Sequence, residues 1–290
     1  MATKTAKPQA LTEKTANISY QSNPFSLSFD KFGLFFEKNL GWAIALIVFP
    51  IFYFFLQMLG AALDTSTESA HAAMNTANTG VTPWLAAVVA FLVLFSTLII
   101  AFMIVAGVAL NTFITGLFTY VALENDAGRT ARFGAALDAV VSRFWRLFLA
   151  QLLALAKIFG WTLLLIVPGI VAAFRYALLP YVIMDESAKE KGVKKSHERV
   201  KTLVQGRKRE VFGVATVAAI IPFVGGINQL VGNAALYRQL QVFNDKKLEK
   251  APVHWLNYFG FMLIGLYVLL IVFIVSIAVV AYISDPSQLR

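Results

Sequence analysis

Apolar residues along this chain gather into long runs rather than into short alternating segments. The stretch 84–123 contains no Asp, Glu, Lys or Arg, and further mainly apolar runs cover 40–63, 149–184, 210–243 and 255–283. A helix needs about 20 predominantly apolar residues to cross a bilayer. The pattern therefore predicts an all-α fold, that of a polytopic helical membrane protein.

Proline, glycine and polar residues divide these runs into seven predicted spans, at 40–63, 84–108, 149–167, 170–184, 210–223, 227–243 and 255–283. Tight turns are predicted at Pro168-Gly169 and at 223–226. The segment after residue 108 is expected to continue as one apolar helix to about Tyr120. Two crossings within 84–123 would place the arginines that follow on the same side as the Lys- and Arg-free loop 64–83, against the usual distribution of positive charge.

Three amphipathic helices are predicted at 25–39, 129–148 and 192–206, because large apolar side chains recur there at helical spacing between charged ones. Each precedes two predicted spans. The chain thus divides into a cytosolic tail (1–24), expected to be disordered, a membrane bundle of three such units (25–243), and a last part (244–290) with a basic loop, an extra span and a short outer tail.

Charge fixes the predicted orientation. The chain is 58% hydrophobic and 14% charged, and its net charge of +9 comes from 25 Lys and Arg against 16 Asp and Glu. Basic residues gather before the first span and in 124–147, 186–209 and 244–254. Cytosolic loops carry such an excess of Lys and Arg. We therefore predict a multi-pass plasma (inner) membrane protein with a cytosolic N-terminus and an outer C-terminus, and no nucleic-acid partner.

Two basic residues, Lys157 and Arg175, are predicted deep within spans, where each costs about 2.5–3.5 kcal/mol. They indicate either a site for an anion or lipid phosphate, or side chains that extend to the interface and bond freed carbonyls. Asn228, Gln229 and Asn233 extend this candidate anion site, or else form hydrogen bonds between helices.

The basic amphipathic helices are predicted to contact anionic lipid head groups of the cytosolic leaflet, each cation contributing about 1 kcal/mol, or else only to fix topology. The candidate head-group residues are Arg129, Arg132, Arg143, Arg146, Lys194, Lys195, Arg199 and Lys201.

Enzymatic chemistry is not indicated. The chain has no cysteine, so it has no thiolate nucleophile and no disulfide. Its three histidines, at 71, 197 and 254, lie outside the predicted spans and lack the spacing of metal ligands. Ser196 adjoins His197, but neighbouring helical residues diverge, so Ser196 is predicted on a helix surface. We expect no catalytic residue, no metal and no cofactor.

One part of the chain resembles a known family. The segment "IVPGIVAAFRYALLPYVIMDE", the basic helix "KKSHERVKTLVQGRKREVFG" and the later "LYRQL" are similar to YciC-like membrane proteins, which are related to the glycerophosphoryl diester phosphodiesterase membrane-domain family. The resemblance covers about 129–245. It implies a polytopic membrane protein, generally of six spans, and carries over no activity because no phosphodiesterase domain lies within these 290 residues.

The predicted function is that of a non-enzymatic integral inner-membrane protein, acting in envelope or lipid homeostasis or as the membrane subunit of a complex. The alternative is a permease for an anionic or amphipathic solute, with Arg175 and Lys157 lining the path. The spans 170–184, 210–223 and 227–241 reach about 22 Å, less than the bilayer core of about 30 Å, which favours a lipid-related role through local thinning.

Overall fold

The computed structural model describes residues 19–48, 51, 55, 58, 83–185, 192–221 and 224–284. All regular secondary structure within these ranges is helical. Most of the predicted disordered tail, residues 64–82 of the predicted loop 64–83, most of the first predicted span beyond residue 48 and the outer tail lie outside the described residues.

The named helices are α1 (Pro24–Phe29), α3 (Pro83–Asp126), α4 (Phe133–Leu164), α5 (Ile166–Tyr176), α6 (Leu179–Met184), α7 (Val193–Leu203), α8 (Lys208–Ile220), α9 (Gly225–Asp245), the short 3-10 helix η1 (Trp255–Tyr258) and α10 (Phe259–Ser284). Residues 32–48 form a further helix. The all-α prediction is confirmed for the described part of the chain.

Four helical stretches in the described ranges are long and apolar enough to cross a membrane, namely Leu94–Asp126, Phe133–Leu164, Val167–Met184 and Trp255–Ile277. The protein is therefore membrane-embedded in character. The sequence predicted seven spans, and neither α8 nor α9 is among these four stretches. α8 has 13 residues, or about 20 Å, and α9 is rich in polar side chains.

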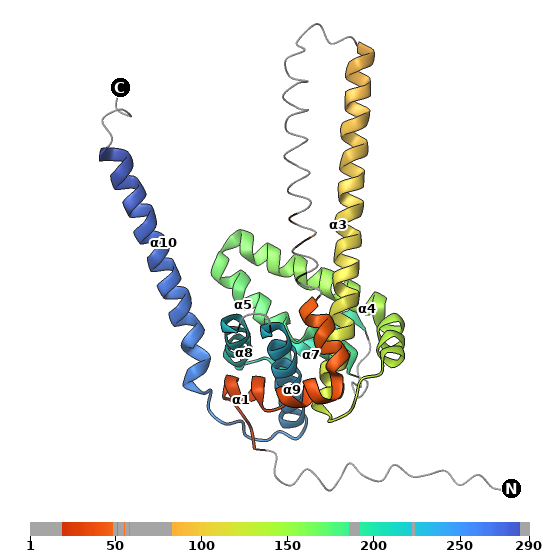
Figure 1. The fold of residues 1–290 in the computed structure, drawn as a ribbon, viewed down its shortest axis with the longest axis vertical. Coiled ribbons are helices and arrows are strands. Elements are labelled where there is room, and N and C mark those ends of the chain that lie inside the picture. Colours follow the sequence, from red (N-terminus) through yellow and green to blue (C-terminus); the bar gives the residue numbers. More distant parts are fainter. Residues whose placement is uncertain are drawn as a thin grey trace, which may run out of the picture.

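α9 lies at the centre of a compact group of helices, here called the helical base, which consists of α1, α4 to α9 and the C-terminal part of α3 (Figure 1). α9 contacts α1, α3, α6, α7 and α8. Its side chains Ile227, Leu236 and Leu240 are buried. A Cβ atom on Gly232 would lie 2.8 Å from Val214 of α8 and 3.0 Å from Ser28 of α1, so glycine permits this close packing.

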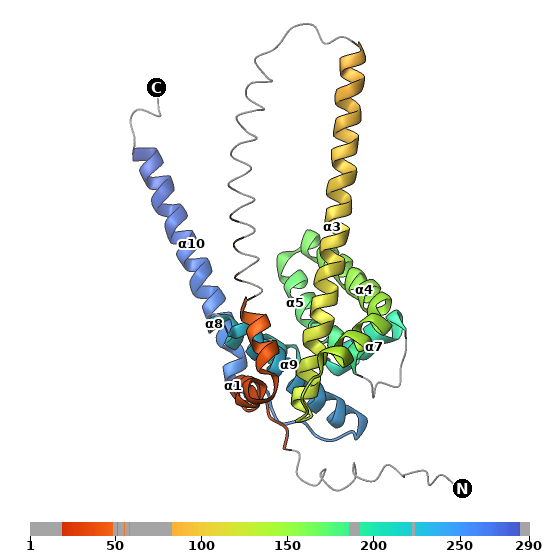
Figure 2. The same cartoon turned by 45° about the vertical axis from the view of Figure 1, so that its right-hand side comes forward.

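Two long apolar helices, α3 and α10, extend from the helical base on the same side (Figures 1 and 2). α3 has 44 residues and is about 66 Å long. The residues 84–120 therefore form one uninterrupted helix, as predicted, and not a hairpin. Large apolar side chains such as Phe102 (71%) and Leu266 (64%) are exposed along both helices. A helix that is apolar all round suits a lipid environment.

α4 is a single helix from Phe133 to Leu164. The prediction of a separate amphipathic helix at 129–148 followed by a span at 149–167 is therefore wrong. Residues 135–159 contain neither glycine nor proline, and the buried residues Ala136, Val140, Leu147, Ala150 and Ala154 form one continuous stripe. No residue along this stretch interrupts the backbone hydrogen bonds of α4 or its buried face.

The bend between α4 and α5 lies at Leu165, which is extended, and not at the predicted Pro168-Gly169. Pro168 falls in the first turn of α5, where a missing N–H costs nothing because that group has no partner within the helix. Gly169 packs against Thr162 of α4, and a Cβ atom there would lie 2.9 Å from the Thr162 Cα atom. The α4–α5 hairpin tip points to the same side as α3 and α10 (Figures 1 and 2).

Two other predicted helices are interrupted. The span 170–184 is divided between α5 and α6, because Pro180 lacks the N–H that would continue the ladder from α5. The amphipathic helix 25–39 is broken by a turn at Asp30-Lys31, which separates α1 from the helix 32–48. The third, 192–206, is observed as α7 with nearly the predicted bounds.

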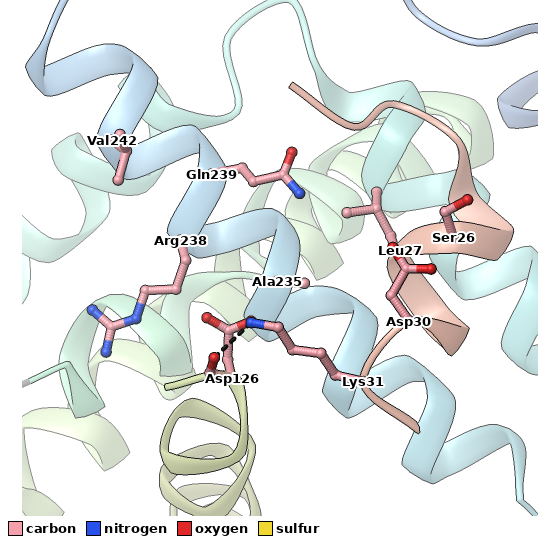
Figure 3. Close-up of a pocket in the computed structure, with 9 residues that line it drawn as sticks. All are labelled: Ser26, Leu27, Asp30, Lys31, Asp126, Ala235, Arg238, Gln239 and Val242. Atoms are coloured by element: carbon pink, nitrogen blue, oxygen red, sulfur yellow. Dashed lines mark hydrogen bonds and ion pairs between the residues drawn. The ribbon is translucent and has the colours of Figure 1, made fainter. Parts of the chain in front are cut away.

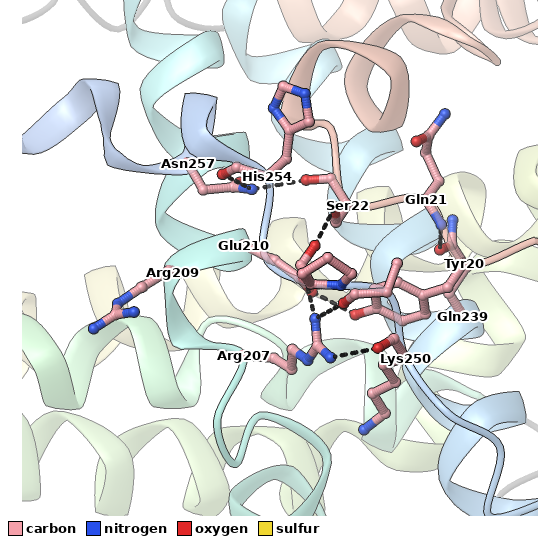
Figure 4. Close-up of polar contacts among 12 residues, drawn as sticks. Tyr20, Gln21, Ser22, Arg207, Arg209, Glu210, Gln239, Lys250, His254 and Asn257 are labelled. Atoms are coloured by element: carbon pink, nitrogen blue, oxygen red, sulfur yellow. Dashed lines mark hydrogen bonds and ion pairs between the residues drawn. The ribbon is translucent and has the colours of Figure 1, made fainter.

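The segment before α1 is fastened into the helical base by a buried ionic group (Figure 4). The Tyr20 hydroxyl donates to the Glu210 carboxylate, and Arg207 Nη1 lies 2.9 Å from Glu210 Oε1. The Arg207 guanidinium lies 5.0 Å from the Tyr20 ring centroid. Burial, with the charge of Glu210, raises the pKa of Tyr20, so its hydroxyl remains a donor.

Two further bonds attach this segment to the linker before α10. Ser22 Oγ donates to the carbonyl of Pro252 at 2.9 Å, and Asn257 Nδ2 donates to the carbonyl of Ser22 at 2.7 Å (Figure 4). Asn257 is itself fully buried. The segment from residue 20 to 22 therefore closes the base between α8, α9 and η1.

Candidate functional site

Arg175 of α5 and Lys208 of α8 lie on two helices that contact each other. The rings of Phe174 and Phe212 meet edge to face at 4.9 Å. Arg175 follows Phe174 directly, and Lys208 lies four residues before Phe212, on the same face of α8. Burial, and next the positive charge of Arg175, lower the pKa of Lys208. The two cations are therefore near enough to affect each other's charge, and we call them the α5–α8 cation pair.

Neither member of the α5–α8 cation pair forms an ion pair or hydrogen bond with another residue that the structure describes. Both side chains are half-buried. Other arginines of the base have carboxylate partners, such as Arg238 with Asp185 at 3.1 Å and Arg199 with Asp245 at 2.7 Å. Like charges near one another in a partly desolvated place repel one another, which disfavours the charged form of Lys208.

Lys157 occupies a different place. Its Nζ atom lies 5.6 Å from the ring centroid of Tyr176, and the His197 ring packs on the same tyrosine at 5.0 Å. His197 Nε2 lies 3.0 Å from the carbonyl oxygen of Ala150. Because Arg175 and Tyr176 are consecutive in α5, they point in different directions. Lys157 of α4 therefore lies beside Tyr176 of α5 and near His197 of α7, and Arg175 points away from this group.

The three polar residues proposed on α9 differ in their surroundings. Asn228 is fully buried, and neither polar atom of its side chain has a hydrogen-bond partner. Asn233 is 5% exposed and its Oδ1 atom has no partner. Gln229 is exposed. No described hydrogen bond joins them to Lys157 or Arg175, and the exposed Gln229 lies on a different face of α9 from the buried Asn228.

The predicted head-group residues fall into two groups. Arg143 and Arg146 donate to the carbonyls of Met184 and Ile183, at 3.4 and 2.6 Å, and so cap the C-terminal end of α6. Arg129 pairs with Glu124 and Arg199 with Asp245. The remaining residues, Arg132, Lys194, Lys195 and Lys201, are exposed. These exposed cations are the ones free to meet a lipid surface.

A cavity of about 320 Å³ lies between α3, α4 and the α5–α6 pair. Its walls are mainly apolar, with polar groups contributed by Asn111, Gln151 and Tyr176. Thr112 Oγ1 donates to Gln151 Oε1 at 2.8 Å, an interhelical bond of the kind expected between membrane helices. Neither Lys157 nor Arg175 lines this cavity.

A second cavity, of about 290 Å³, lies between α1, the end of α3 and α9 (Figure 3). Asp30, Lys31, Asp126 and Arg238 supply its charges. Lys31 Nζ lies 2.6 Å from Asp126 Oδ1, and Arg238 is paired with Asp185. Its cations are therefore already neutralised within the protein, unlike the α5–α8 cation pair.

The described residues contain no group of three His, Cys, Asp or Glu side chains that could hold a metal ion. Ser196 is 1% exposed and donates to the carbonyl of Gly192 at 2.9 Å. The prediction that Ser196 lies on a helix surface is therefore wrong, because α7 turns this face into the base against α4 and α6. Its hydroxyl is engaged by backbone and does not point to a catalytic pair with His197.

Sequence reasoning did not identify Lys208 as a site residue. It is one of nine basic residues between 189 and 209, and only the packing of α8 on α5 distinguishes it. Comparisons of the chain with protein-family models, curated proteins and solved structures found no match.

Proposed function

We propose that this is a non-enzymatic integral inner-membrane protein that acts on membrane lipids by thinning the bilayer locally. Its orientation is the predicted one, with the basic loops toward the cytosol and the short apolar helices of the base within the bilayer. This places it in envelope or lipid homeostasis, alone or as the membrane subunit of a complex.

The observation that carries this proposal is the contrast in helix length within one bundle. α10 has 26 residues and α3 has 44, whereas α8 has 13. The apolar tip of the α4–α5 hairpin, with Leu163, Leu164 and Leu165 exposed, also rises less far than α3 (Figure 1). A short apolar segment held beside long ones is accommodated by bilayer thinning.

Lipid movement in reconstituted vesicles tests the proposal. The full chain is placed in vesicles that carry a head-group-labelled fluorescent lipid, and a membrane-impermeant reductant reports lipid that reaches the outer leaflet. We expect faster movement than in empty vesicles of the same lipid. The excess should shrink in short-chain vesicles whose core matches α8, because the mismatch is then removed. No excess over empty vesicles would overturn the proposal.

The permease alternative requires Lys157 and Arg175 to line one path. Lys157 lies over the ring of Tyr176, whereas Arg175, the preceding residue of α5, points in a different direction. Arg175→Gln discriminates between the two functions. Thinning depends on helix length, so lipid movement should be nearly unchanged in this variant, whereas a permease should lose solute transport.

A further inference from the structure

We propose that the cavity between α3, α4 and the α5–α6 pair binds an uncharged glycerolipid of the diacylglycerol type. Part of its acyl chain lies against the apolar wall, and its ester and hydroxyl oxygens meet Asn111, Gln151 and Tyr176. The proposal rests on the membrane placement in the proposed function, but not on thinning of the bilayer. It adds a binding site and a class of ligand to that function.

The walls of this cavity are helix segments that are apolar enough to cross a membrane. Its lining residues all belong to the stretches Leu94–Asp126, Phe133–Leu164 and Val167–Met184. α3 and α4 lie side by side and contact each other (Figures 1 and 2). Leu155, one of the lining residues, is 51% exposed, so the cavity reaches the outer surface of the helices. In the proposed placement that surface is covered by bilayer lipid.

The size and the apolar lining of the cavity suit part of a lipid chain. Its volume of about 320 Å³ lies at the lower end of the range for small-molecule sites, about 300–1,000 Å³. Small side chains at Ala154, Ala173 and Ala177 leave this space open. The cavity therefore holds a segment of an acyl chain, while the rest of the lipid remains in the bilayer.

Three neutral polar side chains line the same cavity. Thr112 Oγ1 donates to Gln151 Oε1 at 2.8 Å, which fixes Gln151 and leaves its Nε2 amide without a partner among the described residues. The exposed Asn111 amide and the Tyr176 hydroxyl likewise form no described hydrogen bond. Hydrocarbon offers no water to such groups, so leaving them unpaired is costly. Glycerolipid ester carbonyls and a hydroxyl supply the missing acceptors and a donor.

The described lining contains no charged side chain, which selects against a phosphate. Along α3, Asn111 lies about 20 Å before Glu124, the first charged residue that follows it. A phospholipid whose ester reached this level would carry its phosphate into the hydrocarbon, where a charge is costly. Lys157 does not line the cavity, and its Nζ atom lies 5.6 Å from the Tyr176 ring centroid. An uncharged lipid is therefore the ligand that fits.

Photo-cross-linking in reconstituted vesicles tests the site. The full chain is placed in phosphatidylcholine vesicles with a trace of a diacylglycerol that carries a diazirine near the ester end of one acyl chain. Mass spectrometry then locates the labelled residues. We expect label on Val108, Leu155 and Ile158, which line the cavity. Excess unlabelled diacylglycerol should remove this label.

Asn111→Leu tests the polar contact, and Asn111 bonds to no described residue, so the fold should be kept. The amount of unlabelled diacylglycerol that halves the label should rise about five- to tenfold, the effect of one lost hydrogen bond. Gln229→Leu is the matched control, because it removes an exposed amide of α9 that lies outside the cavity. It should behave as the wild type does.

Ala173→Phe tests the space itself. The added ring fills the cavity, so label on the lining residues should be lost. Ala156→Phe adds the same ring to an exposed position of α4 outside the cavity and should leave the label in place. If Ala173→Phe does not fold, Asn111→Leu still tests the site.

Two results would overturn the proposal. Label spread over the exposed faces of α3 and α10, and unchanged by excess diacylglycerol, would mean annular lipid only. Competition by added phosphatidylglycerol as strong as that by diacylglycerol would show that the site does not select an uncharged lipid. Neither result would affect lipid movement in vesicles, and absence of that movement would leave the labelling unchanged. The two proposals therefore stand or fall separately.

Discussion

His197 shows how one buried side chain makes the helical base sensitive to pH. Only 5% of the residue is exposed, and its Nε2 atom faces the carbonyl of Ala150. Burial, together with the nearby positive charge of Lys157, lowers the pKa of His197, although the bond to Ala150 opposes this. The neutral imidazole is therefore the form that fits the fold.

Stability should consequently fall as the pH drops below about 6.5, the ordinary value for histidine. In that range the unfolded chain binds a proton that the folded chain resists, and so the unfolded state is favoured. The stability that neutral, buried His197 adds to the fold is fully present above about pH 6.5 and is lost as the pH falls below that value. Thermal unfolding of wild type and His197→Gln between pH 7.5 and 5 measures the effect, as a steeper acid loss in the wild type. Parallel curves would contradict this account.

At the residue scale, sequence identified Arg175 as a cation without a counter-ion in its own helix, because charge is rare in apolar runs. It did not identify Lys208, since a lysine in a basic segment carries no distinguishing signal before α8 packs on α5. The burial of Ser196 was missed for the same reason. Whether a polar face of α7 meets solvent or protein depends on tertiary contacts.

At the element scale, two adjacent glycines at the start of α9 have different structural roles. A Cβ atom on Gly225 would lie 2.0 Å from the carbonyl oxygen of Ala218 in α8, a backbone atom. A Cβ atom on Gly226 would meet nothing within 4 Å. The tight connection between α8 and α9 therefore depends on the first glycine only.

Gly225→Ala should destabilise the protein by about 1–3 kcal/mol, the usual cost of forcing atoms into a packed site. Gly226→Ala, its matched control, should be neutral or stabilise by up to about 1 kcal/mol, because alanine favours the helix. Unfolding temperatures in the same detergent compare the two variants. Equal losses in both would show that the close approach of Ala218 does not limit this turn.

The apolar runs predicted α3 and α10 as helices, and the arginines that follow residue 123 predicted α3 as one piece. Element ends were harder to predict. Pro168 and Gly169 were assigned to a turn because these residues often break helices, yet proline is equally suited to a first helical turn. The continuity of α4 depends on one buried stripe that packs against α3, α5 and α6. The charged residues up to Arg146 suggested a separate amphipathic helix, so this stripe was not recognised in the sequence.

At the scale of the whole molecule, the helical base lies at one end of α3 and α10, and the apolar lengths of both helices extend from it (Figure 1). The described loop at 127–132 and the linker 246–254 both adjoin this base. Under the proposed orientation they face the cytosol, and the segment before α3 faces outward.

Single cysteines can report this orientation, because the chain contains none of its own. We expect Ala127→Cys and Leu248→Cys to resist a membrane-impermeant maleimide in intact cells and to react after permeabilisation. Gly80→Cys, in the predicted outer loop 64–83, should react in intact cells. Labelling of Ala127→Cys from outside would reverse the proposed orientation.

The hydrogen bonds of Tyr20 and Ser22 also imply an order of events during synthesis of the chain. These residues leave the ribosome early, but their partners Glu210, Pro252 and Asn257 are translated only after most of the apolar helices. Ser22 and Asn257 are 235 residues apart in the chain. The N-terminal segment therefore cannot form this bond until Asn257 has been synthesised. Final closure of the base is a late event, and a chain that stops before η1 cannot complete it.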